Sequence, residues 1–256
     1  YDVSGITAYN GNSRIIYGGT LYAGATETVT LTVAYTVPDG CTLNGFTDGN
    51  GNALTDNGDG TYTLTMTGAA ATVTPDVTDL WGIADGRDGS TAAKAYRITT
   101  PDGLDLLASK VNGGTNYYGK YFEMGADITY SYTGLGENES NYTAIGTGSG
   151  NYFKGKFDGK GHTVSGIRIY MDDTNNQGIF GKITEYAEVK NVTIADARIT
   201  GHYYVGGIVG WNSYGTVENC HALSTVTISG TSNIGGITGY NEGTVKGCTS
   251  AATVSG

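Results

Sequence analysis

The stretch Gly206–Gly230, GGIVGWNSYGTVENCHALSTVTISG, decides the fold, because related sequence stands on both sides of it. GIFGKITEYAEVKNVTIADARITG precedes it and GGITGYNEGTVKGCTSAATVSG follows it. One glycine of the unit recurs every 29 residues, at Gly181, Gly210 and Gly239, and one valine every 28, at Val189, Val217 and Val245. Such a period is typical of repeat architectures, in which each unit leaves an apolar face that a neighbouring unit covers.

Within each unit the apolar residues come in short runs of period two, broken by Gly and Asn, which predicts strands rather than helices. We expect two or three strands per unit, and units stacked about 4.8 Å apart as the coils of a parallel β-helix. Like side chains would then form buried ladders, one of Ile179, Ile208 and Ile237 and another of Val189, Val217 and Val245. The strong preference for right-handed parallel crossovers predicts a right-handed helix.

Cysteine usage predicts free thiols rather than disulfides. Cys220 and Cys248 hold the same place in successive units, and Cys41 is far from both. Side chains stacked in parallel register point the same way, which the geometry of a disulfide does not allow. Three cysteines in this arrangement are not a disulfide framework.

The overall charge disfavours two classes of partner. Only 15% of the 256 residues are charged and the net charge is −10. Nucleic acids and anionic membranes are bound through basic surfaces, so neither is expected as a partner. No stretch has the length and apolarity of a membrane span, so membrane insertion is not expected. A hydrophobic content of 38%, with 43 Gly and three Pro, predicts a folded chain rich in strands and turns.

Residues 1–79 have a different pattern and predict a small antiparallel β domain in front of residues 80–256. Apolar and β-branched polar residues alternate over 29–37 and again over 61–67. The Asp-, Asn- and Gly-rich stretches 48–52 and 56–60 predict hairpin turns. The spacing of Asp48, Asn50 and Asn52 also fits the start of a calcium loop, but Ala53 stands where that loop needs glycine, so no metal site is predicted.

A single amphipathic helix is predicted at about 101–111. Thr100 suits the N-cap and Pro101 the first helical position, and apolar residues follow at helical spacing: Leu104, Leu107, Ala108 and Val111. A helix directly upstream of a repeat array would cover the apolar face of its first coil.

Residues 117–176 are predicted to form irregular opening coils. Residues 121–124 and 126–128 are expected to pair with each other, and 131–141 to form a loop. Ile167 and Ile169 are expected to continue the ladder of Val192 and Ile194.

Several segments resemble known bacterial surface proteins. GKYFEMGADI at 119–128, FKGKFDGKGHTVSGIRI at 153–169 and the repeated GG-I-x-G-x-N units are similar to GLUG-motif β-helices, which occur in adhesins and in the non-catalytic part of immunoglobulin A peptidases. AGATETVTLTV at 23–33, with GNGNALTDNGDGTYTLTM at 49–66, resembles the divergent internalin-type repeat domain. The resemblance implies an extracellular or cell-surface location and a non-catalytic adhesin, binding or stalk module.

Catalytic motifs are absent from the sequence. His162, His202 and His221 stand in no HExxH pair, so no metal site, cofactor or catalytic residue is predicted. The alternative is a carbohydrate-active β-helix enzyme, a polysaccharide lyase or glycoside hydrolase, which needs clustered carboxylates. The candidates are Asp158, Asp172, Asp173, Glu185, Glu188 and Asp196, with Arg168 and Arg198. No carboxylate recurs in register among the repeats, which disfavours this alternative.

A ligand-binding surface is the remaining functional candidate. Trp211-Asn212 and Tyr240-Asn241 hold equivalent places in successive units. Aromatic rings with neighbouring amides suit a glycan or a host extracellular protein. The predicted binding residues are Tyr203, Tyr204, Trp211, Asn212, Tyr214, Tyr240 and Asn241. The competing explanation is that these side chains only stabilise the fold as internal ladders.

The last unit stops at the end of a strand, Val254-Ser255-Gly256, with no cover after it. We therefore expect this sequence to be one section of a longer surface polypeptide, with further coils or a polar cap beyond it.

Overall fold

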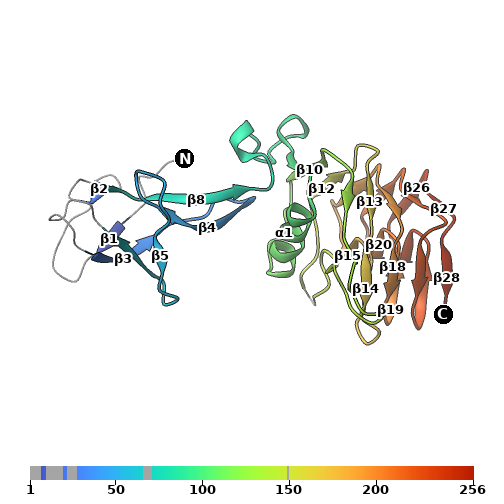
Figure 1. Cartoon of the computed structure of the whole chain (residues 1–256). Coiled ribbons are helices and arrows are strands. Elements are labelled where there is room, and N and C mark those ends of the chain that lie inside the picture. Colours follow the sequence, from blue (N-terminus) through green and yellow to red (C-terminus); the bar gives the residue numbers. More distant parts are fainter. Residues whose placement is uncertain (1–6, 10–19, 22–27, 66–70, 149) are drawn as a thin grey trace. The chain divides into compact units, whose positions relative to one another are not determined.

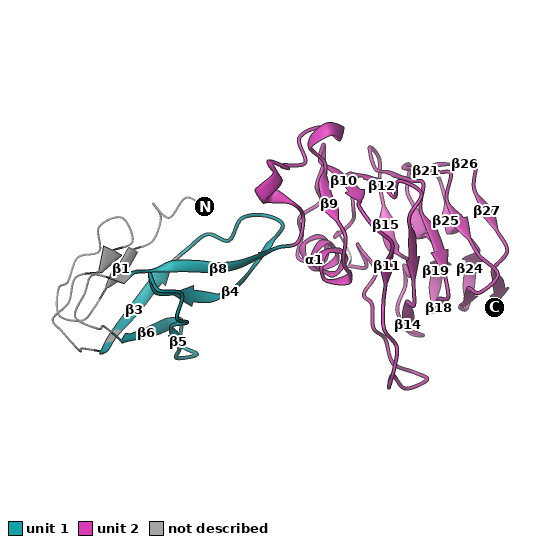
Figure 2. Ribbon diagram, turned by 45° about the horizontal axis from the view of Figure 1, so that its top comes forward, with its two compact units in different colours: residues 1–79 teal, residues 80–256 magenta. Residues whose placement is uncertain are grey.

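The computed structural model describes residues 7–9, 20–21, 28–65, 71–148 and 150–256. The chain divides into two compact units, residues 1–79 and residues 80–256 (Figure 2).

The first unit is antiparallel β structure. One sheet has the strand order β1-β3-β6-β5, and two further pairs are β4-β8 and β2-β7. The strands are β1 (Thr7–Tyr9), β2 (Thr20–Leu21), β3 (Thr28–Ala34), β4 (Cys41–Thr47), β5 (Thr55–Asp56), β6 (Thr61–Thr65), β7 (Ala71–Thr72) and β8 (Thr74–Asp79). The core contains Leu31, Phe46, Leu54, Leu64 and Val73.

Both predicted turns are present in this unit. Asp48 Oδ1 accepts hydrogen bonds from the backbone N–H groups of Asn50 and Asn52, each 2.8 Å long, so the carboxylate closes its own turn. The second turn joins β5 to β6, which pair antiparallel. The sequence patterns did not predict β4 or β8. Residues 23–27 and 66 of the internalin-like segments lie outside the described residues.

Residues 80–256 form a parallel β-solenoid of about five turns behind one helix (Figure 1). The longest sheet contains β9 (Tyr96–Ile98), β10 (Tyr121–Met124), β12 (Lys156–Asp158), β16 (Glu188–Lys190), β21 (Thr216–Glu218) and β26 (Thr244–Lys246). The next contains β11 (Ile128–Thr129), β13 (Thr163–Ser165), β17 (Thr193–Ala195), β22 (His221–Ala222) and β27 (Thr249–Ser250).

Three more sheets complete the wall of the solenoid. One contains β14 (Arg168–Tyr170), β18 (Arg198–Thr200), β23 (Thr227–Ser229) and β28 (Thr253–Ser255). Another contains β19 (Tyr203–Gly206) and β24 (Ser232–Gly235), and the last contains β15 (Phe180–Ile183), β20 (Val209–Asn212) and β25 (Thr238–Asn241). The coil from β16 to β20 thus has five short strands rather than the two or three expected, because Gly and Asn turn the chain after every few residues.

The predicted ladders are confirmed. Val189 pairs in register with Val217, which pairs with Val245. Ile179 and Ile208 are fully buried, and the backbone N–H of Ile208 donates to the carbonyl of Ile237 over 3.0 Å. The repeat units therefore stack one upon the next as the period requires.

Two expectations for the opening coils are wrong. Strand β10 pairs with β9 and β12, and β11 pairs with β13, so β10 and β11 belong to different sheets. Ile169 lies in register with Ile199, whereas Ile194 stacks on Val164. The step between these coils is 30 residues rather than 25, because Ile169 lies on β14, whose partner in the next coil is β18, whereas Ile194 lies on β17, the partner of β13.

Helix α1 (Pro101–Asn112) confirms the predicted cap. Thr100 Oγ1 accepts a hydrogen bond from the N–H of Gly103 over 3.2 Å, and the indole N–H of Trp81 donates to the Gly103 carbonyl over 2.8 Å. The buried side chains of the helix, Leu104, Leu107, Ala108 and Val111, belong to the same apolar cluster as the interior of the coils. The helix therefore covers the first coil (Figure 1).

The three cysteines are free, as predicted. Cys220 is fully buried, and its backbone N–H points to the sulfur of Cys248 at 3.4 Å. In the described part of the chain, no helix is long and apolar enough to cross a membrane.

Candidate ligand-binding surface

A row of aromatic and cationic side chains runs across four successive coils. Lys182 on β15 lies in register with Trp211 on β20, which lies in register with Tyr240 on β25. Phe153 bridges to Ile183, which places Tyr152 beside Lys182. Alternate residues of a strand face opposite sides, so these four side chains face outward while Phe153 and Ile183 are buried. We call Tyr152, Lys182, Trp211 and Tyr240 the aromatic rank.

Tyrosines of β19 extend the aromatic rank sideways. The ring centroid of Tyr204 lies 5.2 Å from that of Trp211 and 5.3 Å from that of Tyr240. Tyr203 follows at 6.3 Å from Tyr204, and its other side contacts the ring of His202 at 3.8 Å. The structure thus brings together Tyr203, Tyr204, Trp211 and Tyr240, four of the residues predicted from sequence.

Lys182 lies within this cluster of rings. Its ammonium group is 3.4 Å from the ring centroid of Trp211 and 5.1 Å from that of Tyr152. Burial lowers the pKa of Lys182, and the negative charges of Glu242 and Glu185 partly oppose that effect. The Trp211 indole N–H donates to Glu242 Oε2 over 3.0 Å, which fixes the plane of the ring. A tryptophan held in this way offers a rigid apolar face.

An open groove lies beside the aromatic rank. The rank contributes Tyr152, Lys182 and Trp211 to its wall, and the chain leading into β15 contributes Asp173 and Asn175. The ring of His202 lines the same groove. Such a combination of ring faces, amide, imidazole, ammonium and carboxylate groups supplies apolar area together with directed hydrogen bonds.

Tyr204 has a left-handed backbone conformation and is one of four tyrosines with a positive φ among the described residues. Its φ is +60°, and the residues in register with it, Asn176 and Asn233, have φ values of +61° and +56°. Asn tolerates the left-handed region, but a bulky aromatic residue there costs about 1–2 kcal/mol. The corner therefore favours Asn. The Tyr in this coil adds a ring to the surface, and its left-handed backbone conformation costs free energy that Asn would not lose.

Three of the predicted binding residues, Asn212, Tyr214 and Asn241, lie outside this cluster of rings. Asn212 is fully buried, and its side-chain nitrogen donates to Asn241 Oδ1 over 2.7 Å and to the carbonyl of Gly215 over 3.2 Å. This asparagine closes the interior of the coil and is not available to a ligand. Tyr214 is 68% exposed at a corner, outside the ring contacts of the rank. Asn241 is exposed and donates to the carbonyl of Gly243 over 3.1 Å.

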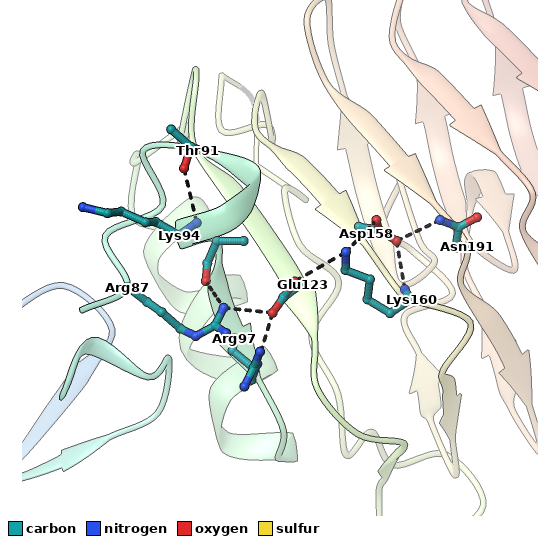
Figure 3. A network of polar contacts seen from close by, with 9 residues as sticks. Arg87, Thr91, Lys94, Arg97, Glu123, Asp158, Lys160 and Asn191 are labelled. Carbon is teal, nitrogen blue, oxygen red and sulfur yellow. Dashed lines mark hydrogen bonds and ion pairs between the residues drawn. The ribbon is translucent and has the colours of Figure 1, made fainter. Parts of the chain in front are cut away.

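A second candidate, which sequence reasoning missed, is a charged cluster on the β10–β12–β16 face (Figure 3). Arg87 Nη1 and Arg97 Nε donate to Glu123 Oε1 over 2.8 Å and 3.1 Å. Lys160 Nζ lies 3.6 Å from Glu123 Oε2 and 3.4 Å from Asp158 Oδ2. Glu123 and Asp158 are in-register neighbours. The repeat period of the later coils does not predict this carboxylate pair.

Two carboxylates of this face, Asp158 and Glu188, have pKa values below their ordinary range. Burial raises the pKa of Asp158. The hydrogen bond from Asn191 and the contacts with Lys160 and Lys190 together lower that pKa by more than burial raises it, so the net shift is downward. Glu188 also has a lowered pKa, chiefly through its hydrogen bond with Lys190. A carboxylic acid that donates a proton to a glycosidic oxygen needs the opposite shift, so neither side chain suits that role.

The other carboxylates named as enzyme candidates are dispersed. Asp196 pairs with Arg168 at 3.0 Å, Glu185 with Lys154 at 2.7 Å, and Arg198 with Glu137 at 3.7 Å. Asp172 accepts from the Tyr170 hydroxyl and Asp173 from the Thr174 hydroxyl. Each of these groups has a local structural partner.

Two of the histidines have polar partners. His162 Nδ1 lies 3.0 Å from Asp127 Oδ1, and His221 Nδ1 lies 2.8 Å from Thr249 Oγ1. Within the described residues, no group of three or more His, Cys, Asp or Glu side chains is placed to hold a metal ion.

Residues 201–227 match the family model described as the GLUG motif. This match covers most of one solenoid coil, from Tyr203 of β19 to the start of β23, and includes Tyr204 and Trp211. It does not extend to residues 1–79, for which the internalin-type resemblance stays a prediction.

Two curated relatives are similar over part of their length. Halomucin from Haloquadratum walsbyi is 31% identical over 164 residues, which is 59% of this chain and 2% of halomucin. A "putative Gly-rich membrane protein" from Evansella cellulosilytica is 30% identical over 134 residues, 50% of this chain and 14% of that protein. The chain therefore spans only a small part of the relatives it matches.

Among solved structures, the crystal structure of a "putative immunoglobulin A1 protease" from Bacteroides ovatus is similar, with a TM-score of 0.40 and 15% identity. The similarity covers 65% of this chain and 68% of that one.

Proposed function

We propose that this chain is a non-catalytic binding module of a secreted or cell-surface protein, and that it binds a glycan through the aromatic rank. The observation that carries the proposal is the in-register placement of Tyr152, Lys182, Trp211 and Tyr240 beside an open groove. One relative is named as a membrane protein, which supports the location.

The left-handed Tyr204 supports binding over a purely structural role. A ring that served only to stabilise the corner would have to offset the backbone cost of its own conformation, which an Asn in that place avoids. The ring instead packs in a tilted arrangement against Trp211 and Tyr240, with interplanar angles of 38° and 41°, where it widens the outward aromatic face. Flat ring faces suit the C–H faces of sugars, and the neighbouring amides and imidazole suit their hydroxyl groups.

The test is a glycan array probed with the full chain and three variants. Trp211→Ala and Tyr204→Asn should each weaken binding roughly tenfold, the equivalent of about 1.4 kcal/mol. Tyr204→Asn should leave the thermal unfolding temperature unchanged or higher, because Asn fits the left-handed corner. Tyr118→Ala is the matched control, since Tyr118 is 62% exposed and lies outside the rank.

Retention of binding by Trp211→Ala and Tyr204→Asn would reject the aromatic rank as the site. The enzyme alternative is checked in the same incubations by measuring the length of the bound oligosaccharides. We expect no shortening; shortening that disappears in Asp158→Asn would favour a polysaccharide lyase or hydrolase at the charged cluster instead.

A further inference from the structure

We propose that the glycan bound by the aromatic rank is an acidic oligosaccharide, whose carboxylate pairs with Lys182 while its sugar rings stack on Tyr152, Trp211 and Tyr240. This inference rests on the proposed function and names the substrate class of the same site.

The first observation is the state of the Lys182 ammonium. Most cations of the described residues have a carboxylate partner within ion-pairing distance, as Lys154 has in Glu185 at 2.7 Å and Lys190 has in Glu188 at 2.6 Å. Lys182 has no such partner in the described part of the chain, and its ammonium contacts aromatic rings instead. An ammonium group has three N–H donors, and ring faces satisfy none of them with an oxygen, so these donors remain available on the groove side.

The second observation is the position of that charge. Lys182 is an interior member of the rank, with Tyr152 on the coil before it and Trp211 on the coil after it. A cation enclosed by apolar rings interacts more strongly with an anion than a lysine in bulk water does, because the local dielectric constant is lower. The rank thus places one anion-binding group between stacking surfaces.

The third observation is the length of the rank. Four coils are joined by three steps of about 4.8 Å, so the rank extends over about 14 Å, longer than a single sugar ring. A ligand that contacts all four side chains must be an oligomer, lying along the solenoid axis. One acidic group near its middle would face Lys182.

Three acidic side chains oppose such a ligand: Glu242 and Glu185, whose charges act on Lys182, and Asp173. Asp173 lines the groove, and its carboxylate accepts a hydrogen bond from the Thr174 hydroxyl over 2.9 Å. Repulsion from Asp173 should weaken binding of an anionic sugar. Asp173→Asn should therefore raise the affinity for acidic oligomers and leave the affinity for neutral ones unchanged.

The experiment compares pairs of oligomers that differ only in charge. The probes are hexamers of α-linked galacturonic acid and of β-linked glucuronic acid, each as the free acid and as the full methyl ester, titrated calorimetrically into the full chain. We expect at least one free acid to bind roughly tenfold more tightly than its ester, to bind more tightly than its dimer, and to weaken as salt is added.

Variants of Lys182 separate its charge from its bulk. Lys182→Gln should remove the preference for the free acid, and Lys182→Arg should keep it because the charge and the ring contact remain. Lys246→Gln is the control: it changes the net charge by the same amount at an exposed site that pairs with Glu218 at 3.1 Å. Thermal unfolding of each variant verifies that the fold is intact.

The outcomes distinguish the inference from the proposed function. If esters and free acids bind equally and Trp211→Ala abolishes both, the rank is a glycan site and the acidic class is wrong. If no hexamer binds at millimolar concentration, the acidic class is rejected, while the glycan array decides separately whether the rank binds sugars. If Lys246→Gln reduces binding as much as Lys182→Gln, the preference reflects net charge and Lys182 has no specific role.

Discussion

Ile208 shows at the residue scale why the repeat units depend on one another. Its side chain is fully buried between the coils before and after it, at the centre of the ladder with Ile179 and Ile237. Protein interiors are packed as densely as organic crystals, so the space left by a missing group is not refilled without cost.

Ile208→Ala should therefore lower the free energy of unfolding by about 2–5 kcal/mol, the usual range for large-to-small changes in a core. The free energy of unfolding is measured by chemical denaturation monitored by circular dichroism. Leu223→Ala serves as the control, because Leu223 is 44% exposed and its loss should change stability little. Equal stabilities of the two variants would mean that the ladder is not packed as the structure has it.

The second prediction at the residue scale concerns the reactivity of the buried Cys220 thiol. Burial raises the pKa of the Cys220 thiol to about 12, and the sulfur of Cys248 acts in the same direction. Only the thiolate reacts with disulfide reagents, so Cys220 should stay unmodified in the folded protein at pH 8. Titration in denaturant without reductant should find all three thiols free; a single free thiol would show that Cys220 and Cys248 are oxidised.

At the scale of elements, helix α1 covers the first coil of the solenoid. Its buried side chains belong to the same apolar cluster as Ile98, Phe122 and Met124 of the first strands, so removing the helix would expose part of that cluster to water. The start of the helix depends on one side chain, Thr100, whose hydroxyl accepts from the Gly103 N–H over 3.2 Å.

Thr100→Ala removes this N-cap and should reduce the free energy of unfolding by about 1 kcal/mol, as loss of an N-cap typically does. Thr100→Ser should restore most of the loss, because Ser caps equally well. Ser109→Ala, on an exposed position of the same helix, should be neutral. Differential scanning calorimetry of the three variants tests this, and a Thr100→Ala protein as stable as the parent would contradict the capping role.

At the scale of the whole solenoid, opposite charges are in register at four of the five steps along one row of the longest sheet; at the remaining step Glu123 faces Asp158, and Lys160 contacts both carboxylates. One register position carries, coil after coil, Arg97, Glu123, Asp158, Lys190, Glu218 and Lys246. The neighbouring position pairs Lys156 with Glu188 at 3.6 Å. Opposite charges directly across adjacent strands favour the native register over slipped ones.

This row of charges predicts a stability that falls in acid. The pKa values of Asp158 and Glu188 are lower in the folded chain than their ordinary values of 3.8 and 4.5. Groups of this kind contribute stability above their ordinary pKa, and the contribution disappears as the pH falls through the folded pKa. The unfolding temperature should therefore decrease from about pH 5 downward.

Lys190→Gln removes the main partner of Glu188 and should make that decrease shallower. Lys94→Gln is the control, since Lys94 and Asp88 form an exposed pair at 3.9 Å that contributes little. Unfolding temperatures measured at half-unit steps between pH 7 and pH 3 give the slopes. Identical slopes for the parent and Lys190→Gln would exclude Glu188 as a contributor.

The sequence by itself determined the stacked coils, the Val189–Val217–Val245 ladder and the capping helix. These features are encoded locally or by an equal spacing: a 28-residue repeat places like residues on like positions, and an N-cap followed by apolar residues at helical spacing needs no distant partner. The grouping of Tyr204, Trp211 and Tyr240 was predictable for the same reason, since all three lie in regular coils.

Only the tertiary structure decided the rest. The opening coils differ in length, with 35 residues from Phe122 to its partner Phe157 and 32 from there to Val189, so no period reveals that Glu123 lies beside Asp158 or Ile169 beside Ile199. The inward position of Asn212 likewise could not be inferred, because a polar residue can face the interior wherever backbone carbonyls, here those of Gly215 and Thr244, are placed to accept its hydrogen bonds. The stacking of the coils determines which side chains of different coils become partners. Where the coils differ in length, the sequence spacing does not predict how they stack.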